Sequence, residues 1–187
     1  MTSVVTSGDE YAQTDSEWST RKWDLNFSRE DLSKQKLVFT YGGEIFRAEA
    51  AERDLSVVEF SALCKHDLDV DRALDEKLKE ILSRPDSPDV VESRLSGWWA
   101  HQLSLDCLRV WVSVSDEEMA RRIQTREGGD LANRLQESKQ RQSDDNQRYK
   151  ELYGIDMADM APYNLIVDAD NIDADEVFHL VSNELGG

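Results

Sequence analysis

An arginine stands in the stretch Glu92–Trp99, directly after a short apolar run at Val90-Val91 that is typical of a strand. In an open α/β sheet, the ligand crevice lies at the carboxyl ends of the strands. The guanidinium of Arg94 offers a planar fork of donors that fits a phosphate or a carboxylate. Arg94 is therefore the first candidate for binding an anion. The alternative is a surface ion pair of Arg94 with Glu92 or Glu76.

A second group of arginines occupies two predicted helices, 119–126 and 131–152, which are separated by Gly128-Gly129-Asp130. Residues four or seven positions apart share a helix face, and this relation holds for Arg122 and Arg126, and for Arg134, Arg141 and Arg148. Phosphoryl transfer depends mainly on positioning and on charge stabilisation by Arg, Lys and magnesium. Two helices on a glycine hinge would close these arginines over phosphates and exclude water. The alternative is a coiled arm held by Arg–Glu pairs.

The elements that must position these arginines alternate between strand and helix patterns. Strands are predicted at 36–40, 90–91, 105–114 and 164–168, of which the first is expected to be buried. Helices are predicted from Glu44, from Ser56 with Glu59 completing a capping box, over 68–82, and over 175–185. Alternation of this kind predicts an α/β fold with a parallel sheet and helices on both faces. The length of 187 residues suits a single domain.

Two aspartates, Asp71 and Asp75, lie four residues apart on one face of the predicted helix 68–82. They are either part of a ligand site or a solvated acidic helix face, and without a third ligand nearby no metal site is assigned to them. Trp98 and Trp99 follow Arg94 and either pack in the core or cover a ligand.

The charge of the chain excludes several partners. Lys+Arg total 22 against Asp+Glu 39, for a formal net charge of −17. Nucleic acid and anionic membranes are therefore not expected as partners. The excess of carboxylates resembles the surface of proteins from a salt-rich cytoplasm, and no leader or membrane span is visible, so a cytoplasmic location is expected. Cys64 and Cys107 lie in apolar patterns and are expected to be buried thiols.

The first 35 residues form an atypical, polar segment. A phosphate-binding loop of the type G-x-x-x-x-G-K-[ST] would be expected after a first strand. Val4-Val5 and Gly8 fit the strand and the first glycine, but Asp9-Glu10 place carboxylates where phosphates would lie. The residues that hold donor phosphates are therefore unknown, and disorder of residues 1–35 is an open alternative.

From about Lys36 to Leu185 the chain resembles the archaeal type of cytidylate kinase, a nucleoside monophosphate kinase. The resemblance rests on four motifs in the family's order: Gly42-Gly43-Glu44-Ile45-Phe46-Arg47, Glu92-Ser93-Arg94-Leu95-Ser96-Gly97-Trp98, Arg148-Tyr149, and Tyr153-Gly154-Ile155-Asp156. It fails before Lys36, so the recognisable phosphate loop of the family is lacking.

The resemblance implies a P-loop-kinase-like sheet with helical insertions, an acceptor-binding region at about 44–84 and a lid at about 119–152. It implies ATP with Mg²⁺ as donor and CMP or dCMP as acceptor. The implied acceptor-binding residues are Gly43, Arg47, Asp71, Asp75, Arg94 and Gly97. The implied catalytic residues are Arg122, Arg126, Arg141 and Arg148. Met119 and Gln142 depart from the Arg and Glu that are usual nearby.

We therefore expect a monomeric ATP-dependent kinase of CMP or dCMP. One alternative is a catalytically inactive protein of the same fold that binds CMP and has lost the donor site. A further alternative is a native start upstream of Met1 that carries the missing loop.

Overall fold

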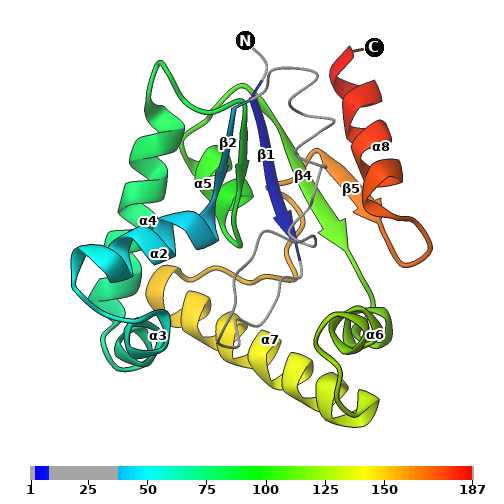
Figure 1. Cartoon of the computed structure of the whole chain (residues 1–187). Helices are drawn as coiled ribbons and strands as arrows, with labels where there is room; N and C mark the ends of the chain where they lie inside the picture. Colours follow the sequence, from blue (N-terminus) through cyan, green and yellow to red (C-terminus); the bar gives the residue numbers. More distant parts are fainter. Residues whose placement is uncertain (1–2, 9–37, 187) are drawn as a thin grey trace.

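The structure of the chain, a computed structural model, describes residues 3–8 and 38–186 (Figure 1). The strands are β1 (Ser3–Gly8), β2 (Phe39–Tyr41), β3 (Val90–Glu92), β4 (Cys107–Ser113) and β5 (Leu165–Asp168). The helices are α2 (Gly42–Glu52), α3 (Val57–His66), α4 (Leu68–Ser83), α5 (Ser96–Gln102), α6 (Asp116–Glu127), α7 (Leu131–Tyr153) and α8 (Ala174–Gly186). In the described part of the chain, none of the helices combines the length and the apolar character that crossing a membrane requires.

The five strands form one parallel sheet in the order β2-β3-β1-β4-β5. Strand β1 is its middle strand and pairs with β3 on one side and β4 on the other. The sheet thus includes residues that the sequence assigned to the atypical N-terminal segment. The rest of that segment, including Asp9-Glu10, lies outside the described residues.

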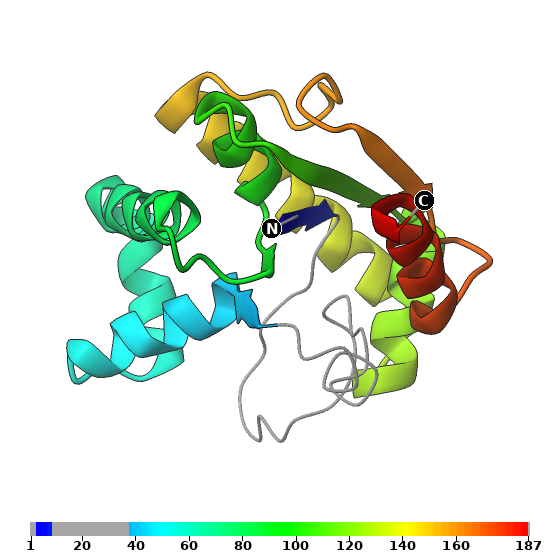
Figure 2. The ribbon, with the colours of Figure 1, turned by 90° about the horizontal axis from the view of Figure 1, so that it is seen from above.

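Helices cover both faces of the sheet, as the sequence predicts. Figure 2 shows α5 and α8 on opposite sides of it. Because side chains alternate along a strand, Val90 of β3 packs in the cluster that contains Val177 and Val181 of α8. Its neighbour Val91 packs on the other face, in the cluster that contains Trp99 of α5.

A third apolar cluster joins α2, α3 and α4 beside the sheet. It is built from Ala50, Phe60, Cys64 and Val70, with the Phe46 and Phe60 rings 4.7 Å apart. Helix α3 begins with the predicted capping box, in which Ser56 and Glu59 satisfy each other's backbone N–H groups. These helices therefore form a unit with its own small core.

The first predicted strand differs from the expectation that it is buried. Strand β2 covers Phe39–Tyr41 and lies at the edge of the sheet, where it pairs with β3. Val38, which precedes it, is 60% exposed. The prediction of a buried strand was wrong because an apolar run does not distinguish a central strand from an edge strand that has one paired side.

The N-terminal turn of α5 depends on a glycine. A Cβ at Gly97 would lie 2.2 Å from Cε1 of Tyr163, whose ring packs 5.1 Å from that of Trp111. We expect Gly97→Ala to lower the free energy of unfolding by about 1–3 kcal/mol, because a buried ring must shift. Urea unfolding checks this, with His101→Ala on the exposed side of the same helix as control. Equal stability of the two variants would contradict the close packing.

Candidate functional site

Arg94 lies in a short, fixed turn between β3 and α5. The Ser93 N–H donates to Ser96 Oγ at 3.2 Å, and Ser96 Oγ donates to the Ser93 carbonyl at 3.0 Å. The start of α2 abuts the same turn, since a Cβ at Gly42 would lie 2.8 Å from Ser93 Cβ. The turn therefore brings Arg94 next to the N-terminus of α2, at the edge where the strands end.

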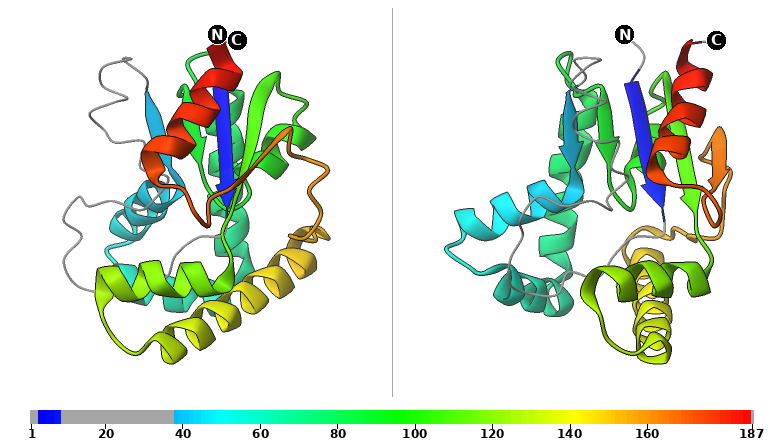
Figure 3. Two further views of the ribbon diagram at one scale, coloured as in Figure 1. Left: turned by 90° about the vertical axis from the view of Figure 1, so that its right-hand side faces the viewer. Right: turned by 45° about the vertical axis from the view of Figure 1, so that its right-hand side comes forward.

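Asp145 of α7 draws three of the arginines together. Its Oδ2 lies 2.8 Å from Arg94 Nη2 and 3.8 Å from Arg141 Nε, and its Oδ1 accepts from Arg148 Nη2 at 2.9 Å. The Arg94 and Asp145 side chains are only 14% and 12% exposed. The expected alternative, a surface ion pair of Arg94, is therefore wrong. Helices α6 and α7 run across the edge at which the strands end (Figure 3), which places Asp145 opposite Arg94.

Asp71 of α4 joins the same cluster. Its Oδ2 lies 3.5 Å from Arg148 Nε, and its side chain is 13% exposed. Burial raises the pKa of Asp71, the Arg148 charge lowers it, and Asp145 raises it again. The alternative of a solvated acidic helix face is therefore wrong at this position, because the carboxylate is packed against an arginine.

The cluster of Arg94, Arg141, Arg148, Asp145 and Asp71 can hold an anionic group. Burial favours a lower pKa for Arg148, but Tyr149, Asp145 and Asp71 together raise it, so the guanidinium stays charged. Guanidinium groups that are already charged, desolvated and aimed at one point stabilise phosphate oxygens without reorganisation. A phosphate would compete with Asp145 for the same donors.

Asp75, one turn after Asp71, has different surroundings. Its Oδ1 accepts from Trp99 Nε1 at 3.3 Å and its Oδ2 from the Tyr153 hydroxyl at 2.6 Å. Burial raises the pKa of Asp75 to about 6, although both hydrogen bonds lower it. Asp75 therefore joins α4 to α5 and to the C-terminal end of α7, and it too is not part of a solvated face.

The raised pKa of Asp75 makes the stability of the protein depend on pH. Because the folded state binds this proton more tightly than the unfolded chain, the proton stabilises the fold at low pH, and that stabilisation is lost as pH rises through about 6. Asp75→Asn has no such proton. Between pH 4.5 and 7.5, we expect the stability of this variant relative to wild type to rise by about 2 kcal/mol.

Urea unfolding at the two pH values measures this difference. Glu80→Gln, on the exposed side of the same helix, is the matched control and should stay within about 0.5 kcal/mol of wild type at both. A constant gap between Asp75→Asn and wild type would contradict the role of burial.

The two arginines of α6 that the resemblance assigns to a lid, Arg122 and Arg126, are engaged elsewhere. Arg122 donates to Glu118, to the Ala169 carbonyl and, at 3.3 Å, to the Ile172 carbonyl, so it ties α6 to the segment after β5. Arg126 pairs with Glu127. Among the described residues, no contact joins Arg122 or Arg126 to Asp145.

Met119 and Gln142, the two positions that depart from the pattern of the resembled family, touch each other. Met119 is 2% exposed. Its sulfur accepts from Ser138 Oγ at 2.9 Å and from Gln142 Nε2 at 3.5 Å. Arg134, the first arginine of the heptad series, instead donates to the Gly128 carbonyl at 3.1 Å and to Glu137. A sulfur–amide contact therefore links α6 to α7 at this point.

The remaining predicted residues lie around the turn that carries Arg94. Gly43 and Arg47 belong to the first turns of α2, and Arg47 is half-buried. Gly97 is buried against Tyr163. Trp99 is a core residue at 1% exposure, whereas the buried Nε1 of Trp98 finds no hydrogen-bond acceptor among the described residues.

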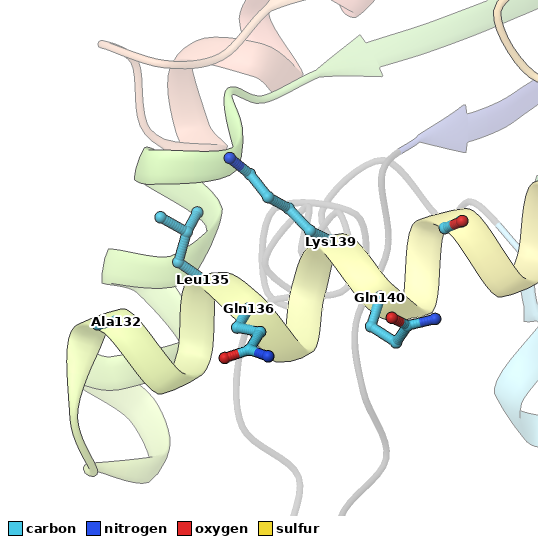
Figure 4. Close-up of a pocket in the computed structure, with 6 residues that line it drawn as sticks. Ala132, Leu135, Gln136, Lys139 and Gln140 are labelled. Atoms are coloured by element: carbon cyan, nitrogen blue, oxygen red, sulfur yellow. The ribbon is translucent and has the colours of Figure 1, made fainter.

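A shallow pocket lies on another face of α7 (Figure 4). It is lined by Ala132, Leu135, Gln136, Lys139, Gln140 and Ser143. Asp145 follows Ser143 by two residues, which is more than half a helical turn, so it points away from this pocket. The pocket is therefore separate from the arginine cluster.

Asp145 is the central residue that the sequence analysis missed. In a long polar helix a carboxylate one turn from arginines is usually a solvated partner. The available signal was its spacing, four residues after Arg141 and three before Arg148, on the face that the arginine repeat had already selected. Tyr153 was named only as part of a family motif, and its contact with Asp75 was not predicted.

The fold is that of a P-loop kinase. A protein from Eubacterium ventriosum described as uncharacterized matches 97% of this chain and 97% of its own, with a TM-score of 0.64 at 10% identity. Shikimate kinase from Bacteroides thetaiotaomicron matches 98% of both chains, with a TM-score of 0.57 at 10% identity. These likenesses show the fold alone.

Relatives found by sequence identify the family within this fold class. No protein-family model matches the chain. The cytidylate kinase of Methanospirillum hungatei is 33% identical over 144 residues, 76% of this chain and 79% of that protein. Those of Halobacterium salinarum and Archaeoglobus fulgidus are 36% and 34% identical, over 75% and 74% of this chain and 71% and 75% of the relatives. The chain belongs to the cytidylate kinase family, whose members are nucleoside monophosphate kinases.

Proposed function

We propose that the chain is an ATP-dependent cytidylate kinase that transfers a phosphoryl group to CMP or dCMP. The observation that carries the proposal is the convergence of Arg94, Arg141 and Arg148 on Asp145 at the strand ends. In a protein of net charge −17, arginines that converge at the strand ends, with Arg94 only 14% exposed, favour an anion site over a role in solubility.

In this proposal the acceptor phosphate binds at the turn after β3. Arg94 holds its oxygens, and Arg47, which is half-buried on the neighbouring helix α2, is the second acceptor-binding residue. Arg141 and Arg148 of α7 stabilise the charge that spreads over the transferred group. Arg122 and Arg126 contribute to the lid, Arg122 by fixing α6 to the segment after β5.

Magnesium and ATP are implied by the family, and one described residue fits the metal. Mg²⁺ in kinases is held by one or two carboxylates together with substrate phosphates and water. Glu92 is a carboxylate only 5% exposed at the carboxyl end of β3, in register with Thr6 near the end of β1. We assign Glu92 to the metal, which would neutralise charge on the phosphates. No donor-phosphate residue is assigned, because the segment after β1, where such a loop would be expected, lies outside the described residues.

A second candidate function is CMP binding without catalysis. The observation that favours it is Asp9-Glu10 directly after β1, where a phosphate-binding loop would need amide donors rather than carboxylates. Such a protein would keep the acceptor pocket and would not use ATP.

The two functions are separated by measuring turnover and binding on the same preparation. ADP formation is followed with ATP and magnesium, with and without CMP, dCMP or UMP, at low and at molar potassium chloride. Calorimetric titration with CMP measures binding without turnover. Turnover that requires CMP or dCMP supports the kinase. CMP binding without turnover at either salt concentration supports the inactive binder, and neither binding nor turnover would overturn both.

A further inference from the structure

A second set of contacts lies beside the arginine cluster and joins the same parts of the chain. The arginine cluster links Asp71 of α4, Arg94 before α5, and Arg148 of α7. One turn along α4, Asp75 binds Trp99 of α5 and Tyr153 of α7. Helices α4 and α7 thus contribute to both the charged cluster and the contact of Asp75, and Arg94 lies in the turn that leads into α5, which carries Trp99.

We propose that Asp75 is a positioning residue that fixes the C-terminal end of α7 against α4 and α5, and thereby sets Arg148 and Asp145 opposite Arg94. The effect that we expect of this positioning role on turnover rests on the proposed kinase function. It gives Asp75 a different role from the acceptor-binding role that the family resemblance implied.

The carboxylate of Asp75 is already engaged on both oxygens. Trp99 is 1% exposed and donates to Oδ1, while Tyr153 donates to Oδ2. The two donor rings also contact each other edge to face, with centroids 4.9 Å apart. Lys79 Nζ lies 4.0 Å from the centre of the Trp99 ring. Because both oxygens of Asp75 accept hydrogen bonds from packed rings, its carboxylate is suited to holding the helices together and not to binding a ligand.

The two ends of α7 are held differently. The N-terminal end follows Gly128 and Gly129, both with positive φ. The C-terminal end stops at Tyr153, where the Gly154 N–H donates to the Lys150 carbonyl and the buried Ile155 follows. Arg148 lies roughly one and a half turns before Tyr153 and Arg141 more than three. A rotation about the Tyr153 end therefore moves Arg148 little and the glycine end far.

The hydroxyl of Tyr153 is the group to remove. We expect Tyr153→Phe to lower kcat/KM for CMP by about tenfold through misplacement of Arg148, while KM for ATP changes less than about twofold. Amide hydrogen exchange of 145–153 should become faster than in wild type, since this end of α7 is released. Asp75→Asn keeps one acceptor oxygen and should lose less activity than Asp75→Ala.

Glu80→Gln is the matched control on the exposed side of α4 and should keep wild-type kinetics and exchange. Wild-type kinetics together with wild-type exchange in Tyr153→Phe would overturn the positioning role, and so would an equal rise in KM for both substrates, which marks a general loss of structure. If wild type does not phosphorylate CMP, the proposed function fails. The exchange rates then decide the positioning role by themselves.

Discussion

Replacing Asp145 with alanine is expected to lower the free energy of unfolding by about 3–5 kcal/mol, because it removes the carboxylate that Arg94 and Arg148 share in a desolvated cluster. Arg94 is 14% exposed and Arg148 28%, so water replaces the lost carboxylate poorly. Asp145→Asn should lie between alanine and wild type, since the amide oxygen accepts a hydrogen bond without supplying charge. Urea unfolding measures the effect.

Asp144→Ala is the matched control. Asp144 is the next residue of α7, is exposed, and accepts from Gln140 Nε2 at 2.7 Å. Its removal should cost less than about 0.5 kcal/mol. The pairing itself is tested by a double-mutant cycle: the cost of Asp145→Ala should shrink when Arg94 is already alanine. Equal costs in both backgrounds would show that Arg94 and Asp145 do not stabilise each other.

Replacing Arg94 should have the largest effect on activity. Under the proposed function, Arg94→Ala lowers kcat/KM for CMP by about 10²–10³, the usual cost of removing a preorganised donor from a charged transition state. Arg94→Lys should recover little, because an ammonium cannot reproduce the planar fork of donors. A coupled assay with varied CMP measures this, and KM for ATP should change little.

Arg84→Ala tests whether loss of any positive charge has the same result. Arg84 is 51% exposed and pairs loosely with Glu80 at 3.7 Å, away from the cluster. It should keep wild-type kinetics at low and at high salt. If Arg94→Ala phosphorylates CMP as fast as Arg84→Ala does, the anion site does not lie at the turn after β3.

Much of the fold could be predicted from local patterns. Helices α4, α6 and α7 correspond to the helices predicted over 68–82, 119–126 and 131–152, the last two of which are separated at the glycines 128 and 129. The parallel sheet follows from the alternation of elements. The edge position of β2 could not be predicted, because it depends on which strands pair and not on the apolar run itself.

The arginines of the candidate site could be predicted from the sequence, whereas its central carboxylate could not. Arg94 was identified by its position after a predicted strand, and Arg141 and Arg148 by their seven-residue spacing on a predicted helix. Asp145 was not, since one carboxylate among 39 acidic residues carries no signal by type. Its significance comes from a contact between α7 and the turn after β3, which only the tertiary structure supplies.

The place of β1 in the sheet has a consequence for synthesis on the ribosome. This strand is made first, yet its partners come much later: Val4 pairs with Val90, and Ser3 with Cys107. At about 5–20 residues per second, translation needs about 5–20 s to reach the second partner. Until β3 is made, both sides of β1 present unpaired backbone groups, and the side that faces β4 stays unpaired until β4 is made. A growing chain that stalls before β4 therefore carries an open strand edge capable of joining another chain.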